Sequence, residues 1–493
     1  MPSFVARGFL FIVILCLILL LWRHREVLTQ PISLGLGENL GSENDTVLSP
    51  LANYTSRPDG LLEANMDGRH PIQILMEEGK KKWKALNDKQ SKTLYQAVTE
   101  YKRRHGYPPP VGFDQWWEYA KKHNVKLVDE FDQINYDVTP YLAVPSEVFR
   151  QRVKELDVLD VGFHFNITKG NFDVYGPGWW LGNPRQLTSI IMEFSRGLPD
   201  MNIHGHESLH GDIWLGEDLR KDARDKVEVL EPFTDAEVAH FERIDRNDRR
   251  NLTNVCLSDD PVFVLSHAVK ASYPAAFIES HVNYLRVCSS PGLLQSGPLF
   301  FSPSARDLKL IPYFVFSKSQ PGAGFLLPTT TWNYHDMALI EPYPWHERVE
   351  PNAHKLFWRG PANGGNWHKG LSQLGSGVSW RNGSRAKLAI MFGKSDATPQ
   401  DDVEILLEDA LDQNKLVVKK YSRAFLNERW MDIGLTGGPS HCSHGDGTCE
   451  EMNKTTLWKH PAYLPTIGRK KFFVDIDGDE WSADFQRRLA FGQ

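Results

Sequence analysis

Apolar residues recur at helical intervals where the chain first shows a regular pattern, just after His70. They predict an amphipathic helix and are Ile72, Leu75, Met76, Trp83 and Leu86. A second helix follows, with Ser91 as its candidate N-cap and the basic residues Lys102–Arg104 at its end, before His105 and Gly106 stop it. A third is predicted over Phe113–His123. The first part of the folded chain is therefore expected to be helical.

Strand-like runs alternate with helical patterns further along the chain. These runs are Val158–Ile167, Pro312–Lys318, His354–Trp358, Lys415–Lys419 and Lys470–Asp475. Helices are predicted over Leu187–Phe194 and Asp402–Leu411, and the charge-rich segment 217–260 is expected to be an exposed helical insertion. Strands that alternate with helices predict α/β layers.

The stretch His354–Ile390 combines a strand with glycines and basic residues. Its strand ends at Arg359 and Gly360 and runs into a glycine-rich loop, after which Arg381 and Arg385 follow. In open α/β sheets, ligands bind beyond the carboxyl ends of the strands, where N–H groups of loops and helix N-termini point at an anion. The stretch is a candidate diphosphate cradle. An ordinary strand with a glycine-rich surface loop is the alternative.

Two further groups of polar residues allow more than one interpretation. One group consists of the four carboxylates Asp129, Glu130, Asp132 and Asp137. Two of them could act as an acid/base pair in catalysis, or all four could be charges at helix N-termini and on solvated faces. A histidine-rich segment is a conceivable metal site, although its neighbours are typical of a loop, and its residues are His204, His206, His210 and Asp212.

The N-terminus carries an uncharged apolar run, Gly8–Trp22, between Arg7 and the basic sequence WRHR. No small-residue cleavage site follows this run, which favours an uncleaved signal anchor over a removable signal peptide. Residues 1–25 are therefore expected to form a cytoplasmic tail and an anchor. Residues 26–69, which are rich in Ser, Asn, Gly and Pro, are expected to form a flexible stem.

Composition limits the architecture and the partners. At 493 residues the chain is long enough for two or more domains, and a hydrophobic content of 41% suffices for their cores. The net charge of −6 provides no basic field, which argues against a nucleic-acid partner.

Potential glycosylation sites and cysteines indicate an oxidising, lumenal environment. The N-x-S/T triplets begin at Asn44, Asn53, Asn166, Asn251, Asn382 and Asn453. Outside the anchor there is an even number of cysteines, and Cys442 and Cys449 are expected to close the loop CSHGDGTC with a disulfide. The alternative is a metal site that combines these thiols with His441, His444 and Asp446.

Several segments between residues 70 and 485 together resemble one family. They are YKRRHGYPPPVGFDQWWEYA, VDEFDQINYDVTPY, GLPDM, FVFSK, KLFWRG, WRNGSRAKL, DGTCEEM and FFVDIDGDEWSADF, in this order. The sequence is similar to the fungal, capsule-associated branch of glycosyltransferase family 90, which also includes the animal protein O-glucosyltransferases.

The resemblance implies a single-pass type II protein of the Golgi or endoplasmic reticulum membrane with a GT-B fold. This fold has two facing Rossmann-like domains, here residues 70–350 on the acceptor side and 351–493 on the donor side. The implied reaction moves glucose or xylose from a UDP-sugar to a hydroxyl of a glycan or glycoprotein, with inversion and without a metal ion or other cofactor.

The resemblance also implies roles for individual residues. The donor-binding residues are expected to be Arg359, Gly360, Arg381, Arg385, Asp477, Gly478 and Ser482. Asp173 is the carboxylate nearest to the position of the catalytic base. The chain ends at QRRLAFGQ, where the family continues, so the donor domain is expected to be incomplete.

Two other classes of function remain open at this point. A non-catalytic, carbohydrate-binding pseudoenzyme is favoured by Pro177, by Asp484 and by the missing C-terminal end, and Pro361 is a further departure from the family pattern. A glycoside hydrolase with two carboxylates is the other class, but it leaves the arginine and glycine residues of the central stretch without a role.

Overall fold

The structure is a computed structural model of the chain. It describes residues 53–57, 60–157, 162–176, 197–205, 214–242, 255–264, 275–290, 310–327, 344–349, 352–365, 380–393, 402–455 and 457–476, together with 188, 192, 367, 368, 478 and 485. The predicted anchor and the predicted helix Leu187–Phe194, apart from residues 188 and 192, lie outside these residues. Within them, no helix is both long and apolar enough to cross a membrane.

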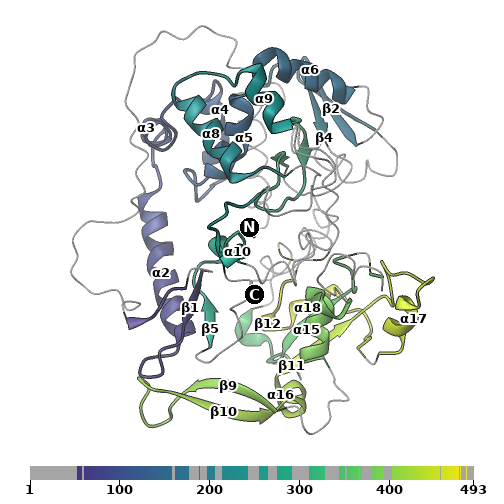
Figure 1. Ribbon diagram of the computed structural model, residues 1–493. Helices are drawn as coiled ribbons and strands as arrows, with labels where there is room; N and C mark the ends of the chain where they lie inside the picture. The colour runs from purple at the N-terminus through teal and green to yellow at the C-terminus, as the bar shows by residue number, and fades with distance from the viewer. Residues whose placement is uncertain are drawn as a thin grey trace. The chain divides into compact units, whose positions relative to one another are not determined.

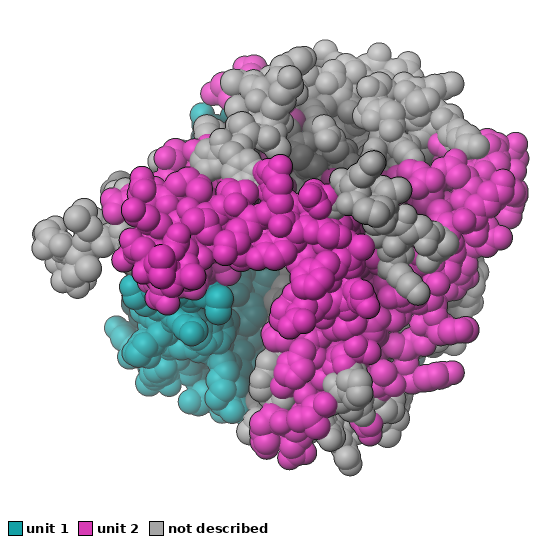
Figure 2. Space-filling model, turned by 90° about the horizontal axis from the view of Figure 1, so that it is seen from below, with its two compact units in different colours: residues 1–52, 76–257, 304–331 teal, residues 53–75, 258–303, 332–493 magenta. Residues whose placement is uncertain are grey.

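The chain divides into two compact units that interleave along the sequence (Figure 2). The first unit takes in residues 76–257 and 304–331, and the second takes in 53–75, 258–303 and 332–493. In this division, residues 258–303 group with the C-terminal part of the chain, and the expected domains 70–350 and 351–493 stay a prediction.

The first unit contains a five-stranded sheet in the order β3-β2-β4-β6-β7, of which Figure 1 labels β2 and β4. Its strands are β2 (Phe163–Thr168), β3 (Asn171–Tyr175), β4 (Met201–Gly205), β6 (Phe314–Val315) and β7 (Phe325–Leu326). The pairs of β2 with β3 and β4 are antiparallel, and those of β6 with β4 and β7 are parallel. Alternate residues of a strand point to the same face, so Phe163, Phe165 and Ile167 are buried together.

The helices of the N-terminal half follow the apolar pattern of the sequence. They are α2 (Pro71–Lys89), α3 (Leu94–His105), α4 (Phe113–Lys122), α5 (Asp132–Leu142), α6 (Ser146–Asp157), α8 (Glu217–Glu228) and α9 (Asp235–Glu242). The predicted helices near His70 and over Phe113–His123 are confirmed. The predicted cap Ser91 is wrong, because Thr93 caps α3 in a reciprocal capping box with Gln96.

The charge-rich segment 217–260 is not simply an exposed insertion. Helix α8 packs against α5, and its Leu219, Arg220 and Ala223 are buried. The guanidinium of Arg220 donates to the carbonyl oxygens of Pro321 and Gly322 and lies 4.4 Å from the centre of the Tyr136 ring. Backbone acceptors and an aromatic face therefore hold one end of this buried guanidinium, whereas its Nε has no hydrogen-bond partner within the described residues.

The second unit contains a parallel three-stranded sheet in the order β11-β8-β12. Its strands are β8 (Leu356–Gly360), β11 (Met431–Leu435) and β12 (Phe472–Phe473). The other elements of this part are α10 (Pro261–Val264), α11 (His281–Tyr284), η4 (Trp345–Glu347), η6 (Trp380–Asn382), α15 (Ser384–Phe392), α16 (Arg423–Trp430), α17 (Thr448–Asn453) and α18 (Leu464–Gly468). Trp358, Ile433 and Ala389 form the core between the sheet and α15.

Two predicted segments have a different structure. The predicted helix over Asp402–Leu411 is wrong, because β9 (Asp402–Glu408) pairs antiparallel with β10 (Leu416–Ser422) in a long hairpin. The part of the expected stem around β1 (Leu61–Glu63) is ordered and pairs with β5 (Ala276–Ile278). The described residues thus form a mixed α/β structure with several sheets, and the full GT-B topology stays a prediction.

Candidate functional site

The order of the parallel sheet marks one edge of it as a candidate site. β8 comes first in the sequence and lies in the centre, with β11 on one side and β12 on the other. The chain therefore adds strands first on one side of β8 and then on the other, and the place where this direction changes is called a switch point. In open parallel sheets, ligands bind at a switch point, beyond the carboxyl ends of the strands. The carboxyl ends of β8 and β12 are therefore the place to look for ligand-binding side chains.

Arg385 joins the two loops that leave these strand ends. It lies in the first turn of α15, and its Nη1 donates to Asn363 Oδ1 at 2.5 Å in the loop after β8. Its Nε and Nη2 donate to the carbonyl oxygen of Ile476 at 3.2 and 3.0 Å in the segment after β12. The fork of donors on one guanidinium therefore fixes both loops and holds a positive charge at this edge.

Gly478 has no side chain and therefore leaves room for the contact between Arg385 and Asn363. A Cβ at this position would lie 2.8 Å from Asn363 Oδ1 and 2.9 Å from Arg385 Cζ, closer than real Cβ atoms come. Gly364 in the opposing loop has a φ of 113°, a conformation that side chains rarely adopt. Helix α15 begins after Gly383, which provides no side-chain cap, and backbone N–H groups of a first turn attract anions. Arg385, Asn363, Gly478 and this helix start form the switch-point site.

Trp367 fastens the loop after β8 to the neighbouring disulfide loop. Its indole Nε1 donates to the carbonyl oxygen of Ala362 at 2.8 Å, and its ring is buried. Its backbone N–H donates to His441, and its carbonyl accepts from the N–H of Ser443. Added Cβ atoms at Gly365 and Gly383 would come within 2.9 and 2.6 Å of the ring. The glycines of this region therefore make room for a tryptophan.

The predicted disulfide between Cys442 and Cys449 is present. Cys256 and Cys288 are disulfide-bonded as well, so none of the described cysteines has a free thiol for a metal. His444 contacts Glu450 at 3.0 Å, and Asp446 accepts the N–H of Thr448 at the start of α17. The metal interpretation of this loop is therefore wrong.

Arg359 lies on the other face of the sheet. Its Nη2 is 2.6 Å from Asp432 Oδ1, and its guanidinium is 4.8 Å from the centre of the Phe357 ring. Arg385, in contrast, lies over the ring of Trp358. Because neighbouring residues of a strand point to opposite faces, Arg359 and Arg385 are on opposite sides of β8. The single cradle predicted from the sequence is divided between two places.

Three cations surround Asp432. Besides Arg359, Lys459 Nζ lies 3.4 Å from Oδ1 and Lys470 Nζ lies 3.7 Å from Oδ2. Burial disfavours the ionised carboxylate, but the hydrogen bond from Arg359 and the charges nearby outweigh it, so the pKa of Asp432 lies below its ordinary value. Burial, reinforced by Arg359, lowers the pKa of Lys459.

The remaining predicted donor residues are dispersed. Arg381 stacks on Trp380 and pairs with Glu451 of α17 at 3.1 Å. Gly360 has no room for a side chain, since a Cβ there would lie 2.7 Å from the ring of Trp358. Asp477 and Ser482 lie outside the described residues. Of the predicted set, Arg385 and Gly478 are thus directly brought together.

Asp173, the predicted base, is exposed on β3, an edge strand of the sheet in the first unit. Its partner across the strands is Asn166, one of the predicted glycosylation sites. Of the other sites, Asn53 and Asn453 are exposed, Asn382 lies in η6, and Asn44 and Asn251 fall outside the described residues.

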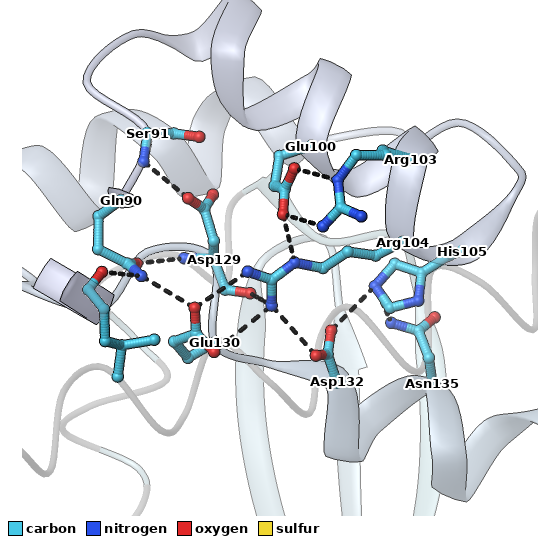
Figure 3. A network of polar contacts seen from close by, with 11 residues as sticks. Gln90, Ser91, Glu100, Arg103, Arg104, His105, Asp129, Glu130, Asp132 and Asn135 are labelled. Atoms are coloured by element: carbon cyan, nitrogen blue, oxygen red, sulfur yellow. Dashed lines mark hydrogen bonds and ion pairs between the residues drawn. The ribbon is translucent and has the colours of Figure 1, made fainter. Parts of the chain in front are cut away.

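The four carboxylates near residue 130 take part in ion pairs and hydrogen bonds, and Figure 3 shows three of them, Asp129, Glu130 and Asp132. Arg104 contacts Glu130 at 3.0 Å and Asp132 at 3.1 Å, and also Glu100 on its own helix. Asp129 accepts the N–H of Ser91, and burial raises its pKa. Asp137 forms a buried pair with Lys318 at 2.5 Å. These contacts favour a structural role over acid/base chemistry.

Of the predicted histidine cluster, only His204 lies within the described residues. It belongs to β4, and its ring packs edge-to-face against the ring of His164. His206, His210 and Asp212 lie outside the described residues. Asn363, Asp432 and Lys459, which the sequence did not single out, contribute to the two charged places on the sheet.

No family model matches the chain, and searches of curated proteins and of solved structures found no match either.

Proposed function

We propose that this protein is a glycosyltransferase that moves glucose or xylose from a UDP-sugar to a hydroxyl of a glycan or glycoprotein, with inversion. The observation that carries the proposal is the position of Arg385, which spans the carboxyl ends of β8 and β12 at the start of α15. The resemblance to glycosyltransferase family 90 supplies the reaction and the class of donor. We assign the main diphosphate contact to Arg385 rather than to Arg359, because Arg359 is engaged by Asp432 on the other face.

In this proposal the switch-point site binds the diphosphate of the donor. As the acceptor oxygen bonds to the anomeric carbon, the bond from that carbon to the diphosphate breaks and negative charge grows on the leaving UDP. Arg385 and the N–H groups at the start of α15 stabilise that charge, so the proposal requires no metal ion or other cofactor. Asp173 is the candidate base that takes the proton from the acceptor hydroxyl.

The proposed location is the membrane of the Golgi or endoplasmic reticulum, with the N-terminal anchor in the bilayer and the folded units in the lumen. The disulfide bonds of all four described cysteines support an oxidising compartment. The exposed Asn53 and Asn453 are accessible for glycosylation. The proposed partners are therefore a UDP-sugar, a glycan or glycoprotein acceptor and the membrane, without nucleic acid.

The test is incubation of the full-length chain with UDP-glucose or UDP-xylose and a set of glycan acceptors, with release of UDP as the readout. Turnover is expected with one of the donors, and Asp173→Asn should abolish it while UDP still binds. Binding of UDP without turnover under any acceptor would instead support a non-catalytic binding protein. Cleavage of glycans without a donor would support a hydrolase and contradict the proposal.

A further inference from the structure

A cavity of about 490 Å³ lies within the first unit, and residues of α6 and of the five-stranded sheet line it. The sheet contributes residues of β4, β6 and β7, and the end of α5 completes the wall. Protein interiors are close-packed and contain few voids larger than a water molecule. A cavity of this volume is typical of small-molecule sites, so it is a candidate for one.

Helix α6 leaves its apolar side chains over this cavity. None of the apolar residues of α6 is fully buried. Phe149 and Val153 are one turn apart, which places them on one face of the helix, and both line the cavity. Leu142 at the end of α5 and Met201 on β4 also line it and are partly exposed. These four side chains therefore have apolar surface left for a ligand to cover.

A second group of lining residues is apolar and closely packed. Val144, Ile203, Phe314 and Phe325 are each at most 3% exposed, and the rings of Phe314 and Phe325 lie 5.2 Å apart. Their side chains offer a ligand or a water molecule no hydrogen bond. Cavities with apolar walls stay dry and take up apolar molecules. This part of the cavity therefore suits a hydrocarbon group.

The charged groups beside the cavity balance one another. Arg150 and Lys154 of α6 line it, and so does the carboxylate residue Asp200. Arg150 is also paired with Glu147 on its own helix. Two cations thus stand beside two carboxylates, so no net charge attracts an ionic head group. The balance favours an uncharged ligand.

We propose that this cavity binds the aliphatic chain of an uncharged amphiphile of the long-chain alcohol class. The chain covers the exposed apolar surface of Phe149, Val153 and Met201. Its hydroxyl lies at the polar side of the cavity, where Ser146 and Asn202 line the wall and are exposed. The inference does not depend on the proposed transferase reaction.

The test is calorimetric titration of the full-length chain in lipid nanodiscs with butanol, hexanol, octanol and octanoate. Nanodiscs without protein give the partitioning of each compound into the lipid, which is subtracted. The affinity should rise roughly fourfold for each methylene added between butanol and octanol, the scale of burying one CH₂ group. Octanoate should bind no more tightly than octanol, because the charges of the wall are balanced.

Two variants that fill the cavity from opposite sides test its location. Val153→Trp on α6 and Met201→Trp on β4 should each abolish the binding of octanol. Their melting temperatures should stay close to that of the wild type, since the added ring occupies space that is already present. Gln151→Trp is the matched control, because Gln151 is exposed on α6 and does not line the cavity, and it should keep the affinity of the wild type.

Wild-type affinity for octanol in both Val153→Trp and Met201→Trp would overturn the inference. An affinity that does not change from butanol to octanol would overturn it as well, because no chain would then be buried. Tighter binding of octanoate than of octanol would contradict the uncharged class of ligand.

Discussion

Arg359 on β8 and Asp432 on β11 form a close ion pair, with Nη2 2.6 Å from Oδ1, although they are 73 residues apart in the sequence. Arg359 Nη1 also donates to the backbone carbonyl of Asp432 at 2.7 Å. β8 and β11 are hydrogen-bonded neighbours, and this double contact fastens the Arg359 side chain to both the side chain and the backbone of Asp432.

We expect Asp432→Asn to destabilise the second unit by about 2–4 kcal/mol, because it leaves three partly buried cations without their shared carboxylate. Repulsion between charges is screened by salt, so the loss should be larger at low than at high ionic strength. The comparison is Glu404→Gln, which breaks the exposed pair with Lys420 and should cost less than about 1 kcal/mol. Chemical denaturation of both variants at two salt concentrations provides the measurement. A loss in Asp432→Asn no greater than in Glu404→Gln would refute the structural role.

Gly478→Ala should weaken UDP binding, because its Cβ would displace Asn363 or Arg385 from their present contact. An effect of about tenfold corresponds to the loss of one charge-assisted hydrogen bond. Gly79→Ala is the control: Gly79 lies inside α2 with open space around its Cα, and an alanine there should stabilise the helix by about 1 kcal/mol. Unchanged UDP affinity in Gly478→Ala would show that this glycine is not needed for the site.

Loss of the Cys442–Cys449 disulfide should lower the unfolding free energy by about 2–3 kcal/mol, which the chain-entropy model gives for so short a loop. The double variant Cys442→Ser, Cys449→Ser avoids leaving one reactive thiol. Because Trp367 is hydrogen-bonded to His441 and Ser443, its fluorescence environment should change as well. Equilibrium unfolding and tryptophan emission are the readouts. A variant identical to the wild type in both would contradict the proposed role of the disulfide in holding the loop around Trp367.

Acid should weaken the Arg104 network of Figure 3 in a defined range. Hydrogen bonds from Arg103 and Arg104 lower the pKa of Glu100 from 4.5 to about 2. A carboxylate whose pKa is depressed by folding stabilises the protein above its unfolded pKa, and this contribution disappears as the pH falls from about 4.5 to about 2. After discounting for solvent screening, the contribution is on the order of 1 kcal/mol.

The check is the difference in unfolding free energy between the wild type and Glu100→Gln across that range. It should be present near neutral pH and vanish at the acid end. A difference that stays constant, or grows as the pH falls, would contradict the assigned ion pairs.

Local sequence patterns predicted several elements well. The strand at His354–Trp358 corresponds to β8, and the amphipathic pattern from Phe113 corresponds to α4. The cap of α3 was within reach of the sequence too, because Thr93 is followed three positions later by Gln96, the signature of a capping box. Short-range chemistry decides such features, so one sequence suffices to read them.

Features that depend on distant partners were not predicted. Segment 402–408 has leucine and glutamate residues that favour helix, but its pairing with β10 and the burial of Leu406 beside Ala64 and Leu416 make it a strand. Likewise, the sequence placed Arg359 at the end of a strand but did not reveal Asp432 as its partner. The alternation of a strand already predicts that Arg359 and Trp358 point to opposite faces of the sheet. Only the fold shows that Arg385 lies on the same face as Trp358.

We propose that Arg385 at the switch-point site, and not Arg359, binds the diphosphate of a UDP-sugar. Calorimetric titration of UDP into the wild type, Arg385→Lys and Arg359→Lys tests it most directly, with Arg429→Lys on the exposed end of α16 as the control. A lysine cannot reproduce the fork of donors that joins Asn363 and Ile476, so Arg385→Lys should weaken UDP binding roughly tenfold or more. Arg359→Lys should lower the melting temperature and keep the affinity of the wild type. Wild-type affinity in Arg385→Lys, or a loss confined to Arg359→Lys, would contradict the account.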